Sequence, residues 1–112
     1  MNNSMNDSIL TSIKGMLGLA EDYTSFDNTI IMHINSVFMV LSQLGIGPTG
    51  GYRITDKNNE WYEYISDKDN LDSVKSYMYL KVKLMFDPPT NSYHTEAIKQ
   101  EINELEWRLT NH

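Results

Sequence analysis

Four stretches of the chain carry apolar side chains every three or four residues, the spacing that gathers them on one face of an α-helix. The first stretch carries Ile9, Ile13, Met16 and Leu17. The second carries Ile30, Ile34, Val37, Phe38, Leu41 and Leu44. The third carries Leu71, Val74, Met78, Val82 and Met85. The fourth carries Ile98, Ile102, Leu105 and Leu109. The pattern therefore predicts four helices that share one small core.

Capping residues and glycines set the expected bounds of the first two helices. Asp7 or Ser8 caps the first helix, and Gly18 ends it. Thr24, three residues before Asp27, provides a variant capping box for the second helix. That helix runs to about residue 44, where a second glycine ends it.

The last two helices are bounded by polar caps and by a proline pair. Asp69 or Asn70 is the expected cap of a helix over residues 71–86. The sequence Asp-Pro-Pro at residues 87–89 ends it, because a proline biases the preceding residue away from helical angles. Ser92 or Thr95 opens the final helix.

The segment between the second and third helices is not helical in pattern. Residues 45–51, GIGPTGG, are the densest cluster of helix breakers and predict a loop. Residues 52–54 alternate like a short strand, and residues 60–65 either return as a second strand or form a helical turn. The predicted fold class is mainly α: a small four-helix bundle with this Gly-rich loop and, under the first alternative, a short β-hairpin. We expect a single domain over residues 1–112, with residues 1–7 flexible.

Several apolar side chains fall outside the core faces. At 100° per residue, Met32 and Met39 lie opposite the core face of the second helix, and Trp107 lies opposite that of the last. The third helix has a second apolar sector around Tyr77, with Lys81 between its two sectors. Scattered exposed apolar residues are common, but the same excess on three helices favours burial against other subunits. The predicted subunit or partner interface comprises Met32, Met39, Tyr77, Leu80, Lys81, Leu84 and Trp107. Within it, Lys81 either extends to water or pairs with a carboxylate of another subunit.

The composition limits the classes of partner. Fifteen acidic and nine basic residues give a net charge of −6 at pH 7, which argues against a stand-alone binder of nucleic-acid phosphates. The chain has no cysteine, which excludes disulfides and cysteine-based zinc sites. The longest strongly apolar run, residues 37–41, is far shorter than the ~20 residues of a membrane span. The N-terminus lacks a secretory pattern, so we expect a protein made in the cytoplasm with no membrane association.

The sequence contains no motif that assembles a catalytic or cofactor site. Gly45 and Gly50 match the outer glycines of a phosphate-binding loop, but Gly-Tyr follows where Lys-Ser/Thr is required. His33 has no second ligand at a zinc-like spacing. Residues 67–71 begin like a calcium loop but lack its glycine and its bidentate acid. We expect no enzymatic activity, no cofactor and no metal.

Residues 13–27, IKGMLGLAEDYTSFD, resemble the opening of the head–tail connector (adaptor, or head completion) proteins of long-tailed bacteriophages. The resemblance continues through residues 30–38 and 43–48, and resumes at residues 74–77, 81–89 (KVKLMFDPP) and 106–109 (EWRL). The shared features are helix starts, helix ends and core positions rather than catalytic signatures, and they span nearly the whole chain.

The resemblance implies a structural protein of the virion, placed at the head–tail junction. Family members form a ring, commonly of about twelve copies, that docks beneath the portal protein after DNA packaging. The ring extends the DNA channel and gives a stopper or tail-completion protein a surface to bind; members often reach the portal through their C-terminal part. Acidic subunits would let DNA pass without binding it specifically. The expected portal- or tail-facing residues are Gly47, Pro48, Tyr52, Arg53, Trp61 and Tyr62.

The exposed methionines and tryptophan also fit a different class of protein, a small dimeric helical adaptor or regulatory protein of a phage or its host. Its genes would lie away from those of the portal and capsid, and it would remain a dimer in solution.

Overall fold

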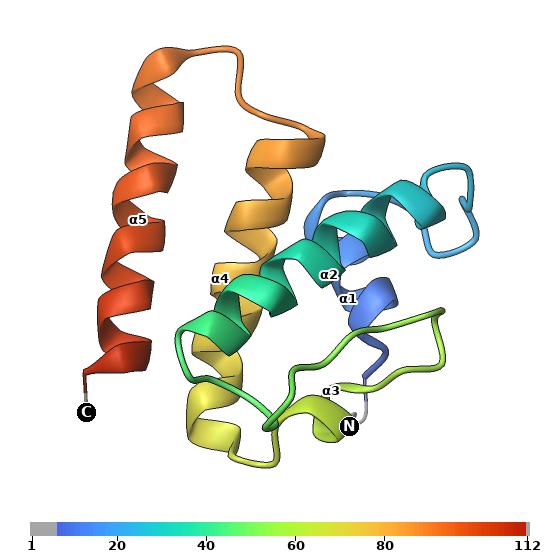
Figure 1. The fold of residues 1–112 in the computed structure, drawn as a ribbon. Coiled ribbons are helices and arrows are strands. Elements are labelled where there is room, and N and C mark those ends of the chain that lie inside the picture. Colours follow the sequence, from blue (N-terminus) through green and yellow to red (C-terminus); the bar gives the residue numbers. More distant parts are fainter. Residues whose placement is uncertain (1–6, 112) are drawn as a thin grey trace.

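The computed structural model describes residues 7–111 and is mainly helical, as predicted (Figure 1). The helices are α1 (Ile9–Met16), α2 (Asp27–Gln43), α3 (Trp61–Tyr64), α4 (Lys68–Phe86) and α5 (Ser92–Thr110). α4 is the central helix: α1 and α2 pack on it from one side, and α5 runs antiparallel beside it (Figure 1). No helix within the described part of the chain is long and apolar enough to cross a membrane.

The alternative of a β-hairpin is wrong, because residues 61–64 form the helical turn α3. The Glu63 carboxylate accepts a hydrogen bond from the Glu60 N–H at 2.6 Å, which closes this turn at its start. Over residues 7–111 the β-structure is limited to one isolated antiparallel bridge between Ser8 and Glu60. The flexibility predicted for residues 1–7 concerns positions outside the described residues, except for Asp7. The Asp7 carbonyl accepts a hydrogen bond from the Trp61 N–H at 3.2 Å.

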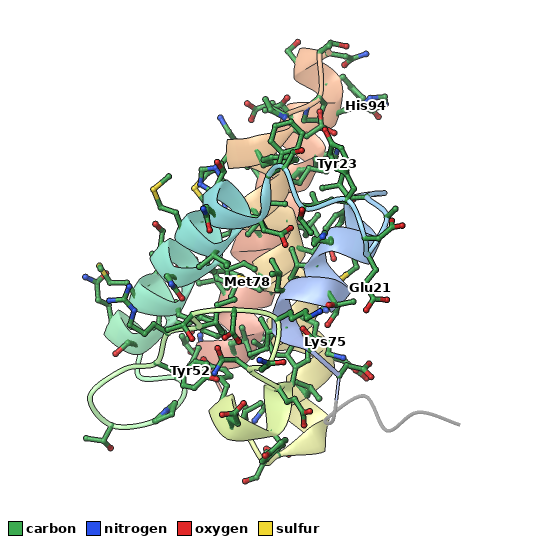
Figure 2. The ribbon with its side chains drawn as sticks, turned by 90° about the vertical axis from the view of Figure 1, so that its right-hand side faces the viewer. Glu21, Tyr23, Tyr52, Lys75, Met78 and His94 are labelled. Atoms are coloured by element: carbon green, nitrogen blue, oxygen red, sulfur yellow. The ribbon has the colours of Figure 1, made fainter. Side chains whose placement is uncertain are left out.

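The core lies where α1, α2, α4 and the inner face of α5 meet. Met78 stands in its middle, between the helices (Figure 2). Most positions of the predicted core faces are buried. Leu17, Leu44 and Ile98 are half-buried, and Met16 and Met85, each in the last turn of its helix, are exposed, at 41% and 43%.

Two glycines end α1 and α2 as the sequence predicts. Gly45 has a φ of +82°, and the Ile46 N–H donates to the Leu41 carbonyl while the Gly45 N–H donates to the Ser42 carbonyl. This pattern satisfies the last helical carbonyls and requires a left-handed residue, which glycine adopts without strain. Gly18 ends α1 with the same pattern. At the other end of α1, the Ser8 hydroxyl caps the helix by accepting from the Thr11 N–H at 3.2 Å.

The predicted capping box of α2 is wrong, because the Asp27 carboxylate is engaged elsewhere. α2 begins without a side-chain cap. The Asp27 carboxylate forms an ion pair at 2.9 Å with Lys14, which is 2% exposed. Lys14 also donates to the Glu21 carbonyl at 2.9 Å, so one buried ammonium ties the 17–26 loop to α1.

The start of α4 also differs from the prediction. α4 begins at Lys68, so Asn70 lies inside its first turn instead of capping it. The Asn70 amide donates to the Asp67 carboxylate at 2.8 Å, and the Leu71 N–H donates to the Asp67 carbonyl at 3.2 Å. α5 begins at Ser92 as predicted, and Asn91 caps it by accepting from the His94 N–H at 3.1 Å.

Candidate functional site

The outer face of α2 is unusually free of charge. Residues 28–52 contain no Asp, Glu, Lys or Arg, although the whole chain has fifteen acidic and nine basic residues. On this face Met32 and Met39 are 59% and 65% exposed, as predicted from their helical positions. Charge depletion around exposed methionines is typical of the centre of a protein–protein interface.

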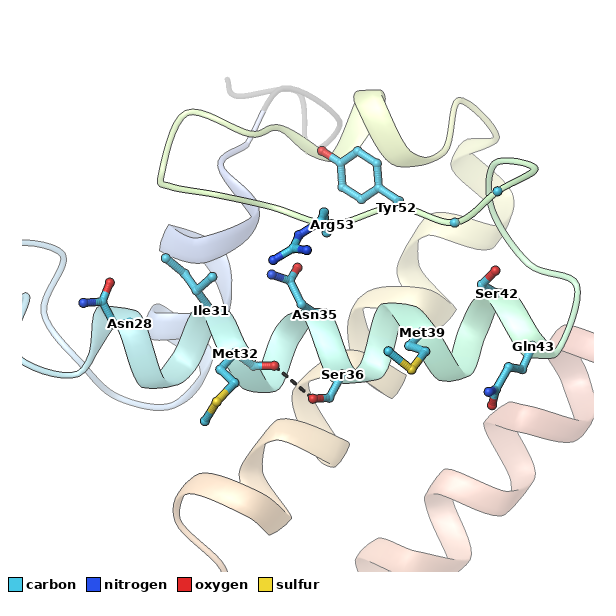
Figure 3. Close-up of a pocket in the computed structure, with 12 residues that line it drawn as sticks. Asn28, Ile31, Met32, Asn35, Ser36, Met39, Ser42, Gln43, Tyr52 and Arg53 are labelled. Carbon is cyan, nitrogen blue, oxygen red and sulfur yellow. Dashed lines mark hydrogen bonds between the residues drawn. The ribbon is translucent and has the colours of Figure 1, made fainter.

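A loop lies along this face and turns it into a groove of about 820 Å³. Figure 3 shows Met32, Ser36 and Met39 along α2, with Arg53 directed from the loop toward the helix. The groove is lined by Asn28, Ile31, Met32, Asn35, Ser36, Met39, Ser42, Gln43, Gly50, Gly51, Tyr52 and Arg53. The structure thus brings together residues of two separately predicted surfaces: the methionines of α2 and Tyr52–Arg53 of the loop.

Asn35 holds the loop against α2. Its side-chain oxygen accepts from the Ile54 N–H at 2.8 Å, and its side-chain nitrogen donates to the Ile54 carbonyl at 3.0 Å. The amide therefore pairs with both backbone groups of one residue, as a neighbouring strand would. Ile54 is 1% exposed and anchors the loop in the core. Asn35 is not among the residues predicted from the sequence, where its one signal is an amide in the middle of an apolar helix.

Replacing Asn35 with alanine is expected to free the loop wall of the groove. The change leaves two backbone groups of Ile54 without partners, which costs about 2 kcal/mol of unfolding free energy. Urea unfolding and the amide exchange of Ile54 measure the effect. Asn28→Ala, an exposed asparagine on the same helix, is the matched control and should cost less than about 0.5 kcal/mol. Equal losses in the two variants would contradict the anchoring role.

The Gly-rich segment folds closely over Tyr64. Gly47 has a φ of +92°, and a Cβ added there would lie 2.5 Å from a ring carbon of Tyr64. The Tyr64 hydroxyl donates to the Ile46 carbonyl at 3.4 Å. Burial raises the pKa of Tyr64 to about 12, so the hydroxyl remains a donor at neutral pH. Only glycine combines this backbone angle with so close an approach.

Tyr77 is a correction to the predicted interface, because it lies fully inside the core. Its hydroxyl donates to the Glu106 carboxylate at 2.8 Å, and burial raises its pKa above the usual value. The second apolar sector of α4 is covered by α5 of the same chain, and Leu80 and Leu84 are half-buried against the core. Lys81 lies with its ammonium 5.6 Å from the centre of the Tyr77 ring, a cation–π contact.

Trp61 is a second correction, in the predicted portal- or tail-facing loop. It is fully buried, its indole N–H donates to the Ser12 hydroxyl at 2.9 Å, and its ring packs edge-on against Phe38. The burial of Trp61 explains why α3 folds back onto the core. The next residue, Tyr62, is 54% exposed. The other residues of this group reach the surface to different degrees: Gly47 and Arg53 are exposed, and Pro48 and Tyr52 are half-buried.

Further exposed apolar side chains lie away from the groove. Trp107 on α5 is 64% exposed, as predicted from its helical position. At the end of the molecule where α2 begins and α4 ends, Tyr23 and Phe26 contact each other edge-on, and Phe26 contacts Phe86. Over the described part of the chain, no three His, Asp or Glu side chains are placed to hold a metal ion together.

Comparison with known families decides the identity of this helical protein. Residues 9–112, which include all five helices, match the family model described as Phage connector protein. The chain belongs to the phage connector protein family. The predicted resemblance to head–tail connectors is therefore confirmed. No curated protein and no solved structure matches the chain at a significant level.

Membership defines the general role of the connector. The family is a structural, non-enzymatic kind of phage protein that associates with portal or capsid and tail components. The connector is thus a bacteriophage structural protein, and the groove on α2, with its exposed methionines, is a candidate contact surface within that assembly.

Proposed function

We propose that this connector forms a closed ring in the phage neck, beneath the portal protein. The ring, of about twelve copies, extends the DNA channel and bridges the capsid to a stopper or tail-completion protein. The family match over residues 9–112 carries the proposal, and two features of the subunit support it.

The first feature is the distribution of exposed apolar surface. A closed ring needs two different faces on each subunit, because every copy contacts its two neighbours head to tail. The groove on α2 and the Trp107 side of α5 belong to different helices, and each exposes large apolar side chains. Such surfaces are costly to leave in water and are suited to contact with neighbours.

The second feature is charge. Each subunit carries a net charge of −6. A ring of such subunits produces a negative field along its channel, which weakens adhesion of the DNA phosphates and favours passage over binding.

The portal and the tail partner contact the connector at the ends of this ring. Gly47, which precedes Pro48, packs against Tyr64 of α3, the short helix that also carries the exposed Tyr62. The exposed Tyr62 ring offers this surface a side chain of the type enriched at interfaces.

Electron microscopy of the purified portal with and without the connector tests the proposal. We expect an added ring-shaped layer on one end of the portal when the connector is present, and the portal alone is the control. A portal unchanged in outline after incubation with excess connector would contradict it. A connector that remains a dimer and does not bind the portal would instead support the adaptor hypothesis.

A further inference from the structure

We propose that the groove on α2 receives the Trp107 face of α5 from a second copy of this chain. This inference rests on the ring proposed above and names the two surfaces that meet in it. Each subunit carries both surfaces. The first is the groove, whose α2 floor has no charged residue and whose loop wall carries Arg53. The second is the outer side of α5, where the exposed indole of Trp107 lies among acidic residues.

The groove is built to receive an apolar side chain from a helix. Met32 and Met39 are two turns apart on α2, and Ser36 lies between them. The floor of the groove therefore has a small serine between two long, flexible methionines. Helices pack by placing the side chains of one into such depressions on another. Methionine adapts its shape to the group that enters. Asn35 fixes the opposite wall through Ile54, so the groove exists before any partner binds.

α5 is the helix with the most uncovered surface. It packs almost wholly on α4, and Figure 1 shows it along one edge of the molecule. Its inner face buries Ile102, Leu105 and Leu109, whereas Trp107 on the outer side is 64% exposed. Within residues 7–111 the Trp107 ring contacts no other aromatic ring, whereas the exposed Tyr23 and Phe26 rings contact each other. Trp107 therefore exposes a large aromatic surface that a partner can bury.

The charges of the two surfaces are complementary. Arg53 is the charged residue among the groove-lining residues that the structure describes, and no acid stands beside it in that set. α5 carries Glu96, Glu101, Glu104 and Glu106 against Lys99 and Arg108, an excess of acid. Glu104, which pairs with Arg108 of the same helix at 2.7 Å, lies one turn before Trp107. An indole entering the groove would meet the Arg53 guanidinium, and arginine stacks well on tryptophan.

The contact is heterologous, because each subunit offers one groove and one α5. A second subunit bound in this way presents its own empty groove to a third, so the contact repeats until the ring closes. An isologous dimer would instead pair a groove with a groove, or one α5 with another.

Single-cysteine variants test this contact without background, since the natural chain has no cysteine. Ser36→Cys places a thiol in the groove, and Asn103→Cys places one a turn before Trp107; both positions are exposed. A size-tagged Ser36→Cys connector is mixed with an untagged Asn103→Cys connector, assembled on the portal and mildly oxidised. We expect a disulfide-linked heterodimer that neither variant forms alone. Adding Trp107→Ala to the Asn103→Cys chain should abolish it.

The matched control is Ser25→Cys, an exposed position in the 17–26 loop outside the groove, mixed with Asn103→Cys. It should give no heterodimer. Suppose that rings are visible on the portal but that the yield of the Ser36→Cys/Asn103→Cys heterodimer is no higher than that of this control. This result would overturn the inference and leave the ring proposal standing. A strong heterodimer without rings on the portal would support the contact and count against the proposed function. Homodimers of Ser36→Cys alone would also overturn the inference, because they require groove-to-groove pairing.

Discussion

Replacing Met39 with aspartate is expected to abolish ring assembly on the portal while the subunit stays folded. Met39 is 65% exposed in the isolated chain, so an aspartate there remains in water and costs less than about 1 kcal/mol of unfolding free energy. In the ring the same carboxylate would be buried on the α2 floor of the groove, which carries no Asp, Glu, Lys or Arg, beneath an acidic helix. Burying a charge poorly paired costs several kcal/mol, so subunit contacts should weaken by roughly a hundredfold or more. Circular dichroism measures the folding, and electron microscopy with the portal measures the assembly.

Met39→Leu is the control for this experiment, because leucine keeps the apolar surface and a similar volume. It should assemble as the natural connector does. If Met39→Asp unfolds the isolated subunit, Met39 belongs to the core and the assignment of α2 faces is wrong. If Met39→Asp still forms rings, the groove is not a subunit contact.

Replacing Trp61 with alanine is expected to lower the free energy of unfolding more than any other substitution proposed above. The side chain is fully buried, its indole N–H donates to Ser12, and the Lys75 ammonium lies 5.5 Å from its ring centre. Removing a buried tryptophan leaves a cavity and costs about 3–5 kcal/mol. For a chain of this size that loss lowers the melting temperature by about 15 °C. Urea and thermal unfolding followed by circular dichroism measure both quantities.

Trp107→Ala is the matched control, since it removes the same side chain from an exposed position. It should change the unfolding free energy by less than about 0.5 kcal/mol. Similar losses for the two tryptophans would show that α5 buries Trp107 in the subunit, contrary to its observed exposure.

Local signals in the sequence were sufficient to place α1, α2, α4 and α5, although α4 begins earlier than predicted. The turns after Gly18 and Gly45 depend on residues only a few positions apart, so the glycine pattern predicts them directly. The cap of α2 could not be predicted in this way. The carboxylate of Asp27 pairs with Lys14, thirteen positions earlier, and a pattern of neighbouring residues carries no sign of that ion pair.

The same distinction explains which residues of the predicted interface are exposed in the subunit. An apolar stripe shows that a helix face is covered, but it does not show whether the cover belongs to the same chain. The second sector of α4, which includes Tyr77, is covered by α5 of the same subunit. Met32, Met39 and Trp107 have no such cover and remain exposed. The apolar surface of these three side chains, unlike that of Tyr77 on α4, is available to a neighbouring subunit.

The groove itself was beyond the reach of the sequence pattern. The helical positions of Met32 and Met39 predict that both face away from the core, but the wall of the groove depends on two hydrogen bonds between Asn35 and Ile54, nineteen residues apart. Contacts of this range form only when the chain has folded. The absence of charge over residues 28–52 was visible from the beginning and marks the same surface.

A cryo-electron microscopy reconstruction of the portal–connector complex would show how the connector subunits contact one another. We expect a closed ring of connector subunits around the axial channel, with α5 of each subunit seated in the α2 groove of the next. Subunits bound singly to the portal without lateral contact, or a portal end with no connector density, would contradict it.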